Sequence, residues 1–412
     1  MPPPYAGIPK IALLCAREWR KKGHEVALTF TYRPKNADEL GANSHYFFEY
    51  TKRPGKLEKF LFLIRYFFTN PALYIELFRS YRAICPHITR EMYLYTAYGV
   101  YLDRVYTAFR PDVVLSEAVL IKTFMAAKIA KRHGVPIMFN VYAEVRDMGM
   151  GENRHLTEDQ RKTYWVSFLT MADLVIGMAN CSVEMKAYIP REKLVAFWDP
   201  DDYEVYSRPV AESKEELRTH FNLPASAFLA CAVGSFELRK GHDHLIRAVA
   251  NVAKAGHDVG VAICGSLGSN EKWRAIAKEE GVEGRAFFFN SLSEPELVKL
   301  LNCVDVNTNL SNTQRCCGLD MGLLEGMAAR LPVIVYDTGA LPGAVPNGEN
   351  GYVVPMNEID KVSEAIVKLM QKTPEERRTM GEKSAEVAKG RDIKLYADIR
   401  LRWFAEMVQK NT

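Results

Sequence analysis

Residues 309–354, NLSNTQRCCGLDMGLLEGMAARLPVIVYDTGALPGAVPNGENGYVV, give the most specific indication of the fold in this chain. The small and polar residues up to Gly318 predict a loop. Apolar residues then recur at helical spacing over 321–328, until Leu331-Pro332 ends the helix. Residues 333–336 predict a buried strand, and the glycines that follow predict a second loop. The stretch therefore predicts one repeat of a parallel α/β sheet.

The start of the helix in this stretch has the features of an anion site. Its free backbone N–H groups and the positive end of its dipole point out of the loop. Gly318 and Gly322 allow a phosphate-sized group to approach the main chain. Glu325 lies one to two turns into the helix, where a carboxylate can accept hydrogen bonds from a ribose diol. The alternative is a Rossmann-like helix without a ligand.

The run GLLEGMAARLPVIVYDTGALPGAVPNGENGYVV, residues 322–354, resembles the signature of the glycosyl transferases group 1 family. The family pattern is similar to EGFGxxLLEAMAxGxPVIxxxxGGxPE followed by an NGxNG-type turn. The resemblance implies a retaining, nucleotide-sugar-dependent glycosyltransferase. It also implies the α/β fold class of GT-B type, which has two facing Rossmann-like domains with a ligand cleft between them.

The chain departs from this signature at its first glutamate. Glu325 matches the second glutamate of the family, whereas Cys317 stands where the family has the first. In the family the first glutamate faces the transferred sugar, so the departure affects donor-sugar identity and catalysis. Asp320, three residues after Cys317, is the nearest carboxylate that can take that place.

Length and composition limit the number of domains and the class of protein. With 412 residues, 48% of them hydrophobic, the chain is long enough for two or three domains. No apolar run reaches the roughly 20 residues that a membrane span needs. The start lacks a basic, apolar and small-residue secretion signal, so we expect the chain to stay in the cytoplasm. Its eight cysteines form no CxxC pair, which favours free thiols in a reducing compartment.

Positive charge is concentrated in the first quarter of the chain. Residues 1–110 contain 17 Lys and Arg against 9 Asp and Glu, a local net charge of +8. No nucleic-acid-binding motif accompanies the charge, so we expect no nucleic acid partner and instead an anionic membrane face or a phosphate-bearing acceptor. Residues 56–70 cluster aromatic and basic side chains. This pattern is typical of a helix at a membrane interface, or of a core-facing helix with basic flanks.

The chain begins with a predicted helix over residues 8–22, followed by a Gly-His turn and a strand. In the family this helix follows a first strand and a PPxxGG loop. Gly7 matches the second glycine of that loop and Ala6 replaces the first, whereas no strand precedes them. Either the true start lies upstream, which we favour, or the sheet is incomplete.

From Pro111 onward, strand and helix patterns alternate as in a parallel sheet. Many relatives have a histidine near the acceptor and sugar at the end of the strand that corresponds to residues 134–144. Tyr142 stands at that position here. Tyrosine donates a hydrogen bond but is a weak base at neutral pH, so a structural strand end is the alternative.

Residues 228–252, FLACAVGSFELRKGHDHLIRAVANV, predict a strand, a loop and a helix. They match the family pattern VGRxxxxKGxxxLIxA, with Lys240 retained and Ser235 in place of the arginine. The resemblance places Lys240 near the donor diphosphate, where it would stabilise the leaving group as a point charge. A solvated lysine is the alternative. His242 and His244 point to different faces of the helix, so we assign no metal.

These observations give one overall prediction. Residues 1–205 form an acceptor-binding Rossmann-like domain, residues 206–390 a nucleotide-sugar-binding one, and residues 391–412 a helix that packs back on the first. The activity is sugar transfer with retention from a nucleotide-diphosphate sugar to a glycan or lipid-linked acceptor, in polysaccharide or glycoconjugate synthesis. It needs no metal and no other cofactor, and takes place in the cytoplasm or at the inner face of the membrane. The rival predictions are a non-catalytic relative that binds a sugar nucleotide or a protein partner, and a nucleotide-sugar epimerase.

The candidate residues are those at the functional positions of the family's sequence pattern. The predicted catalytic residues are Lys240, Asp320 and Tyr142. The predicted donor-binding residues are Gly7, Ser235, Lys240, Cys317, Gly318, Leu319, Asp320 and Glu325.

Overall fold

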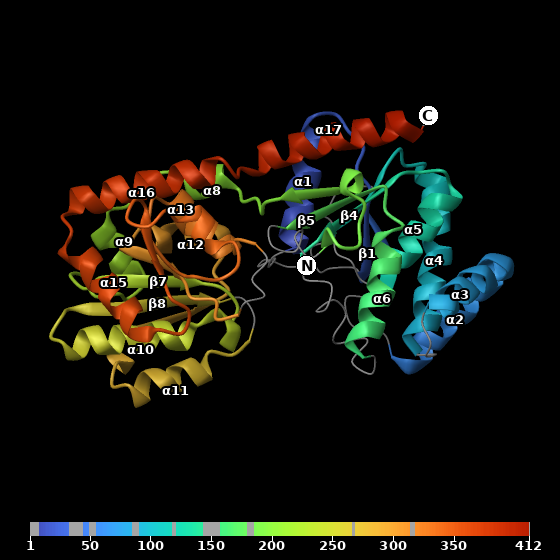
Figure 1. The fold of residues 1–412 in the computed structure, drawn as a ribbon. Helices are drawn as coiled ribbons and strands as arrows, with labels where there is room; N and C mark the ends of the chain where they lie inside the picture. Colours follow the sequence, from blue (N-terminus) through green and yellow to red (C-terminus); the bar gives the residue numbers. More distant parts are fainter. Residues whose placement is uncertain are drawn as a thin grey trace. The chain divides into compact units, whose positions relative to one another are not determined.

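The computed structural model describes residues 8–32, 44–48, 55–84, 90–117, 121–142, 157–178, 185–265, 268–313 and 318–411. The chain forms two compact units (Figure 1). The first contains Ala12–Phe197 and the residues from Ala397 onward. The second contains Trp198–Tyr396 together with residues 8–11 at the start of the first helix.

The second unit is built on a six-stranded parallel sheet in the order β12-β11-β10-β7-β8-β9. Successive strands run outward from β7 to β9, after which the chain crosses to β10 and runs outward in the other direction. This is the strand order of a dinucleotide-binding Rossmann sheet. The strands are β7 (Phe228–Val233), β8 (Val259–Gly265), β9 (Ala286–Asn290), β10 (Val306–Asn309), β11 (Val333–Tyr336) and β12 (Gly351–Val354).

Helices cover both faces of this sheet. Every residue of β8, β10 and β11 is buried, as expected for central strands of a parallel sheet. One apolar core joins α10 (His242–Lys254), α11 (Glu271–Glu279) and α15 (Ile359–Gln371) to one face of the sheet. A second core joins α9 (Lys214–His220), α12 (Glu294–Leu301) and α13 (Met321–Ala328) to the other face (Figure 1).

Shorter and terminal elements complete the second unit. Helix α16 (Pro374–Lys389) packs on α13 through its uncharged face. Thr373 caps α16, and Ser213 caps α9, each in a capping box with the glutamate three residues later. The remaining short helices are α8 (Tyr203–Tyr206) and α14 (Leu341–Ala344).

The first unit contains a four-stranded parallel sheet in the order β3-β4-β5-β6 and a separate parallel pair, β1-β2. The four strands are β3 (Val114–Ser116), β4 (Ile137–Val141), β5 (Leu174–Met178) and β6 (Leu194–Phe197). The pair is β1 (Leu28–Tyr32) and β2 (Ser44–Phe48). The helices are α1 (Ile8–Lys21), α2 (Lys56–Thr69), α3 (Pro71–Ile84), α4 (Arg90–Phe109), α5 (Ile121–Arg132), α6 (Glu158–Leu169) and α17 (Ile393–Asn411).

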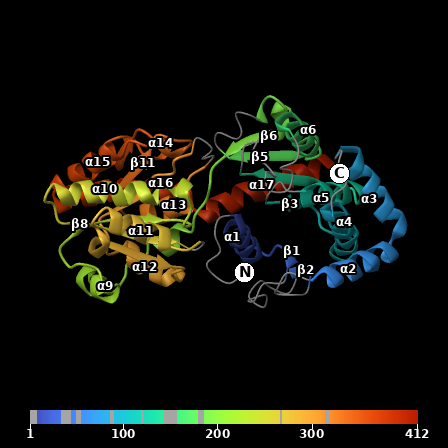
Figure 2. The same ribbon diagram turned by 90° about the horizontal axis from the view of Figure 1, so that it is seen from below.

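Helices α2, α3 and α4 contact one another, and α4 also packs on α5 (Figure 2). These helices α2 to α4 follow one another over residues 56–109, and α2 lies over the aromatic and basic cluster of residues 56–70. The C-terminal part of α17 lies in the first unit, where the Trp19 indole donates to the Ala397 carbonyl at 3.0 Å. Among the described residues, no helix is long and apolar enough to cross a bilayer.

The change from the first unit to the second occurs between Phe197 and Trp198, whereas the sequence prediction placed it between residues 205 and 206. The polar and proline-bearing run after β6 is not a linker. The backbone of Asp201 forms an isolated β-bridge with that of Asp392. The Trp198 ring packs on Tyr396, and Tyr206 is buried in a core of the second unit. These contacts join the run to the second unit.

Four cysteines lie in the described part of the chain, and all four are buried free thiols. Burial raises the pKa of Cys15, Cys264 and Cys303 to about 12, and that of Cys231 well above its usual range. Buried thiols of this kind are unreactive.

Candidate functional site

The loop between β7 and α10 places Lys240. It ends in a short 3-10 turn, Leu238–Lys240, and then in Gly241, whose φ of +65° lies in the left-handed region. A Cβ at Gly241 would meet the Leu310 carbonyl oxygen at 2.0 Å, so this position requires glycine. The contact fixes the turn against the end of β10 and directs the stem of Lys240 over Gly234.

The Lys240 ammonium forms an ion pair with Asp320, at 2.6 Å from Nζ to Oδ1. The other oxygen, Oδ2, accepts from Asn309 Nδ2 at 2.8 Å and from Ser311 Oγ at 3.1 Å. Burial raises the pKa of Asp320, but Lys240 and the two hydrogen bonds outweigh it and hold the pKa below its usual value. Asp320 is thus an ionised carboxylate with both oxygens engaged.

The N-terminus of α13 lies close against the end of β7. A Cβ at Gly322 would meet the Val233 carbonyl oxygen at 2.3 Å, and one at Gly318 would meet Asp199 Oδ2 at 1.7 Å. The buried Asp199 accepts a hydrogen bond from the backbone N–H of Leu319. Burial raises the pKa of Asp199 to about 7, and this N–H opposes the rise. A side-chain carboxyl therefore already uses one N–H of the predicted anion site.

Glu325 lies in the second turn of α13 and is 6% exposed. Its Oε1 is 2.8 Å from Lys10 Nζ, and both residues belong to the second unit. Lys10 also approaches Asp201 and Tyr206, at 3.5 and 3.2 Å. The residue predicted to anchor a ribose is therefore held by a lysine from the N-terminal helix.

Ser235 and the two histidines of α10 have structural partners. Ser235 Oγ donates to Glu237 at 2.9 Å, and the Ser235 carbonyl accepts from His242 Nε2 at 3.0 Å. Burial lowers the pKa of His242 to about 4, so its ring is neutral at physiological pH. His244 Nδ1 lies 2.8 Å from the Tyr336 hydroxyl. Within the described ranges, no group of three His, Cys, Asp or Glu residues is placed to hold a metal ion.

Tyr142 belongs to a polar cluster in the first unit, at the carboxyl ends of β3 and β4. Its hydroxyl donates to Glu117 Oε2 at 2.9 Å, and Asn140 Nδ2 donates to the same oxygen at 3.0 Å. The guanidinium of Arg400, which is fully buried, pairs with the Glu117 carboxylate. Tyr142 therefore ends its strand as a hydrogen-bond donor inside a charged cluster.

Two predicted residues, Gly7 and Cys317, lie outside the described residues. The structure brings Lys240, Gly318, Leu319 and Asp320 together at the carboxyl ends of β7 and β10, with Glu325 farther along α13. Sequence reasoning missed Lys10, Glu117, Asp199 and Asp201. The positions of the three acidic residues could have indicated them, because they follow predicted strands. Glu117 comes directly after β3, and residues 199–202, DPDD, come shortly after β6.

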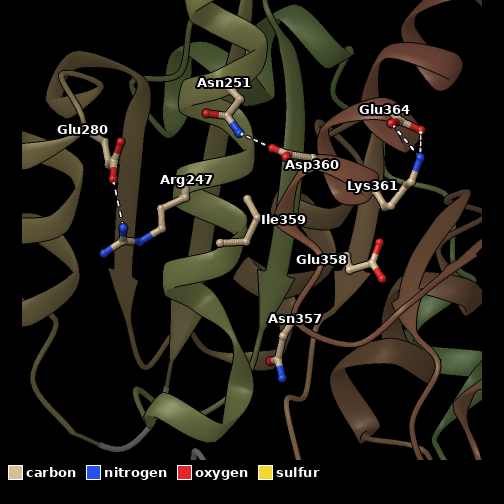
Figure 3. A pocket seen from close by; sticks show the side chains of 9 residues that line it. All are labelled: Arg247, Asn251, Glu280, Asn357, Glu358, Ile359, Asp360, Lys361 and Glu364. Atoms are coloured by element: carbon tan, nitrogen blue, oxygen red, sulfur yellow. Dashed lines mark hydrogen bonds and ion pairs between the residues drawn. The ribbon is translucent and has the colours of Figure 1, made fainter.

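A polar hollow lies elsewhere on the second unit, between α10 and the start of α15 (Figure 3). Several of its charged groups pair with one another. Arg247 contacts Glu280 at 3.2 Å, and Lys361 contacts Glu364 at 2.9 Å. None of the predicted site residues lines it. The lining residues are Arg247, Asn251, Glu280, Asn357, Glu358, Ile359, Asp360, Lys361 and Glu364.

The sequence profile of one family, described as glycosyl transferases group 1, matches residues 213–387, which include the six-stranded sheet, Lys240 and Glu325. Residues 213–387 form a glycosyl transferases group 1 domain. The resemblance noted in the sequence is thereby confirmed. This group 1 domain contains all the predicted donor-binding residues except Gly7.

Curated relatives carry glycosyltransferase names. The chain is 25% identical over 267 residues to the D-inositol 3-phosphate glycosyltransferase of Corynebacterium aurimucosum. It is 29% identical over 168 residues to the GDP-mannose-dependent alpha-(1-6)-phosphatidylinositol monomannoside mannosyltransferase of Mycobacterium tuberculosis. These matches cover 62% and 40% of this chain, and they span only 60% and 43% of the two relatives.

Solved structures confirm the fold class that the sequence predicted, α/β of GT-B type. Anabaena Alr3699/HepE in complex with UDP and glucose matches with a TM-score of 0.70 and 14% identity, covering 97% of this chain and 96% of that one. WaaG, a glycosyltransferase involved in lipopolysaccharide biosynthesis, matches with a TM-score of 0.65 and 15% identity, covering 96% of each chain. At these identities the likeness establishes the fold alone.

Proposed function

We propose that this protein is a glycosyltransferase that moves a sugar, with retention, from a nucleotide-diphosphate donor to a glycan or lipid-linked acceptor. One observation carries the proposal. Lys240, from the loop after β7, meets Asp320, from the connection after β10. Strands β7 and β10 are neighbours in the sheet, and the direction in which successive strands are added reverses between them. Ligands of open α/β sheets bind outside the carboxyl ends of the strands at this point.

Lys240 stabilises the departing diphosphate in this mechanism. One of its three N–H donors goes to Asp320, which leaves two for phosphate oxygens. Asp320 fixes the position of the ammonium. Because both of its oxygens are engaged, its contacts favour a positioning role over direct contact with the sugar. A fixed cation at the leaving group is worth more than a mobile one, because no reorganisation is needed as charge develops.

Retention is proposed without a covalent intermediate. A retaining double displacement needs a carboxylate nucleophile beside the anomeric carbon. Asp320 is fully engaged, and Glu325 is paired with Lys10. Front-face attack, in which the leaving phosphate takes the acceptor proton, therefore fits these contacts better. It needs no metal, since Lys240 and the N–H groups at the start of α13 supply positive charge. Tyr142 stays a predicted hydrogen-bond donor toward the acceptor or sugar.

Glu325 is the proposed ribose anchor. One of its oxygens is held by Lys10, and among the described residues the other, Oε2, has no hydrogen-bond partner. A ribose hydroxyl can donate to that oxygen. Gly318 and Leu319 would lie beside the diphosphate, and Ser235 near Lys240 at the end of β7. Gly7 and Cys317 remain donor-binding residues predicted from the family's sequence pattern.

A thermal-shift screen against UDP-, GDP-, ADP- and dTDP-sugars tests the donor site, because a ligand of the native state raises the melting temperature. We expect a shift with one nucleotide family and a much smaller one for Glu325→Ala. Transfer is then assayed with phosphatidylinositol-type lipids and glycans, because one relative is named for a phosphatidylinositol mannoside substrate. Binding without turnover would favour the non-catalytic alternative. Release of free nucleotide diphosphate without an acceptor would favour the epimerase.

We further propose that α2 contacts an anionic membrane surface, at the cytoplasmic face. Six large apolar side chains recur along one stripe of this helix and are between 36% and 73% exposed. They are Leu57, Phe60, Leu61, Ile64, Phe67 and Phe68. Monomeric proteins rarely leave such a stripe uncovered. The net charge of +8 in residues 1–110 favours a negatively charged bilayer over a neutral one.

Sedimentation with vesicles that contain phosphatidylglycerol tests this contact. We expect wild type to sediment with the vesicles, less so at high salt, and Phe60→Ser/Phe68→Ser to stay in the supernatant. Leu395→Ser is the matched control, because Leu395 is 44% exposed but lies on α17. Equal sedimentation of all three proteins would contradict the proposed contact.

A further inference from the structure

The environment of Glu325 is set by residues that are distant in the sequence. The Lys10 ammonium lies 2.8 Å from Glu325 Oε1, 3.2 Å from the Tyr206 hydroxyl and 3.5 Å from Asp201 Oδ1. It also lies 4.9 Å from the centre of the Tyr206 ring. The side chains of Lys10, Glu325 and Asp201 are only 13%, 8% and 3% exposed. Three chain segments thus build one buried polar cluster, which we call the Lys10 cluster.

The Lys10 cluster has two carboxyl groups and one ammonium. Asp201 Oδ2 is buried and has no hydrogen-bond partner in the described part of the chain. Burial raises the pKa of Asp201 to about 8; Lys10 opposes the rise, and Glu325 adds to it. Burial lowers the pKa of Lys10, but the two carboxyl groups outweigh it and keep this pKa well above its usual value. Lys10 therefore stays charged.

No other described cation forms an ion pair with Glu325. The Tyr206 hydroxyl and the Cys264 thiol also face it; burial raises the pKa of Tyr206 well above its usual range and that of Cys264 to about 12. Helix α16, which packs on α13, contributes buried Met380, Gly381, Ser384 and Ala385, none of them charged. Lys10 is thus the cation that holds Glu325, and Asp201 competes for it.

We propose that Lys10 is a positioning residue of the nucleotide site: it holds Glu325 Oε1 and fixes the carboxylate, so that Oε2 can accept a ribose hydroxyl of a nucleoside diphosphate. This inference rests on the proposed function, in which Glu325 anchors the ribose. The N-terminal helix thereby completes a site that the group 1 domain does not contain in full, because Lys10 lies 315 residues from Glu325.

The physical reason is the loss of the counter-ion. A buried carboxylate that loses its ion-pair partner is strongly destabilised in its place. Without Lys10, the Glu325 carboxylate has no described ion-pair partner and still lies near the carboxyl group of Asp201. The carboxylate would then no longer be fixed in the orientation that offers Oε2 to a ribose, and ribose binding would weaken.

Calorimetric titration of the full-length chain with UDP and GDP, and with their 2′,3′-dideoxy analogues, tests the inference at pH 7. The variants are Lys10→Met, which keeps the length but removes the charge, and Lys10→Arg. Thermal unfolding checks that each is folded. The dideoxy analogues lack the ribose hydroxyls and keep every other group of the ligand.

We expect wild type to bind the diphosphates about tenfold more tightly than their dideoxy analogues, and Lys10→Met to bind both about equally. Lys10→Arg should retain the preference of wild type. A structural role alone would weaken both kinds of ligand by the same factor and would overturn the inference, as would unchanged binding by Lys10→Met. Failure of wild type to bind UDP or GDP would instead refute the donor site itself, and this inference with it.

Discussion

Two lysine–carboxylate pairs in the second unit differ in the number of carboxyl groups around the lysine. Lys240 and Asp320 form a closed pair, because Asn309 and Ser311 satisfy the remaining carboxylate oxygen. Lys10 and Glu325 form an open pair, because a second carboxyl, Asp201, competes for the same ammonium. The pKa of Asp320 is lowered, whereas that of Asp201 is raised to about 8.

The difference indicates different uses of the same chemistry. A carboxylate whose oxygens all have partners fixes its lysine in one place. A cluster with an excess carboxyl group responds to protons and to ligands, because either can relieve the imbalance. The closed pair suits a cation that must meet a leaving group, and the open pair suits a carboxylate that keeps its lysine on one oxygen and offers the other oxygen to a ribose.

The largest expected effect follows from loss of the closed pair's cation. Lys240→Met should lower kcat for transfer by about 100-fold, since removal of one preorganised charge-stabilising group typically costs that much. Steady-state kinetics with the donor identified by the screen measures it. Lys240→Arg is the matched control and should retain part of the rate. A Lys240→Met enzyme within threefold of wild type would remove Lys240 from the mechanism.

Asp320→Asn tests whether the closed pair stabilises the fold. Asp320 has a lowered pKa, so its carboxylate contributes stability above the unfolded value of about 3.8, and this contribution is lost as pH falls through the folded pKa. The variant should therefore be less stable than wild type at pH 7, by roughly 2 kcal/mol, and approach it at acid pH. Urea unfolding at pH 7 and at about pH 2, well below the unfolded value, measures the difference. Equal stability at pH 7 would show that the pair contributes nothing.

The corresponding substitution in the open pair, Asp201→Asn, should change the stability in the opposite direction. Asp201 has a raised pKa, so the folded state holds a proton that the unfolded state has lost between about pH 4 and pH 8. Its contribution is present at low pH and is lost as pH rises through this window. Asp201→Asn should thus gain stability relative to wild type between pH 5 and pH 9, by about 1 kcal/mol.

Urea unfolding of Asp201→Asn across this range provides the measurement, with Asp320→Asn as the matched control on the other pair. If both variants lost stability with the same pH profile, the contrast between a closed and an open pair would not hold.

The closed pair was largely predictable from the sequence. Lys240 and Asp320 both lie in stretches that match a family pattern, directly after strands whose apolar runs identify them. Parallel strands bring such residues to one edge of a sheet, so local patterns sufficed. The sequence did not show that Asp320 would pair with Lys240, because Asn309 and Ser311, which hold its other oxygen, look like ordinary loop residues.

The open pair was not predictable in the same way. Lys10 appears as one basic residue on an amphipathic helix, and Asp199 and Asp201 appear as a polar run typical of a linker. Burial decides their roles, and burial at these positions depends on contacts across most of the chain. The position of Glu325 on its helix followed from periodicity, but its partner did not. The same long-range contacts explain why the second unit begins at Trp198.

The buried cysteines offer a practical consequence. Cys15 lies in the first unit, and Cys231, Cys264 and Cys303 lie in the second, so each unit carries internal thiols that an alkylating reagent reaches only when the surrounding core opens. Peptide-resolved mass spectrometry after brief alkylation would time the opening of each unit separately in the native chain. Protection of the three thiols of the second unit by a nucleotide would then report ligand binding without any engineered label.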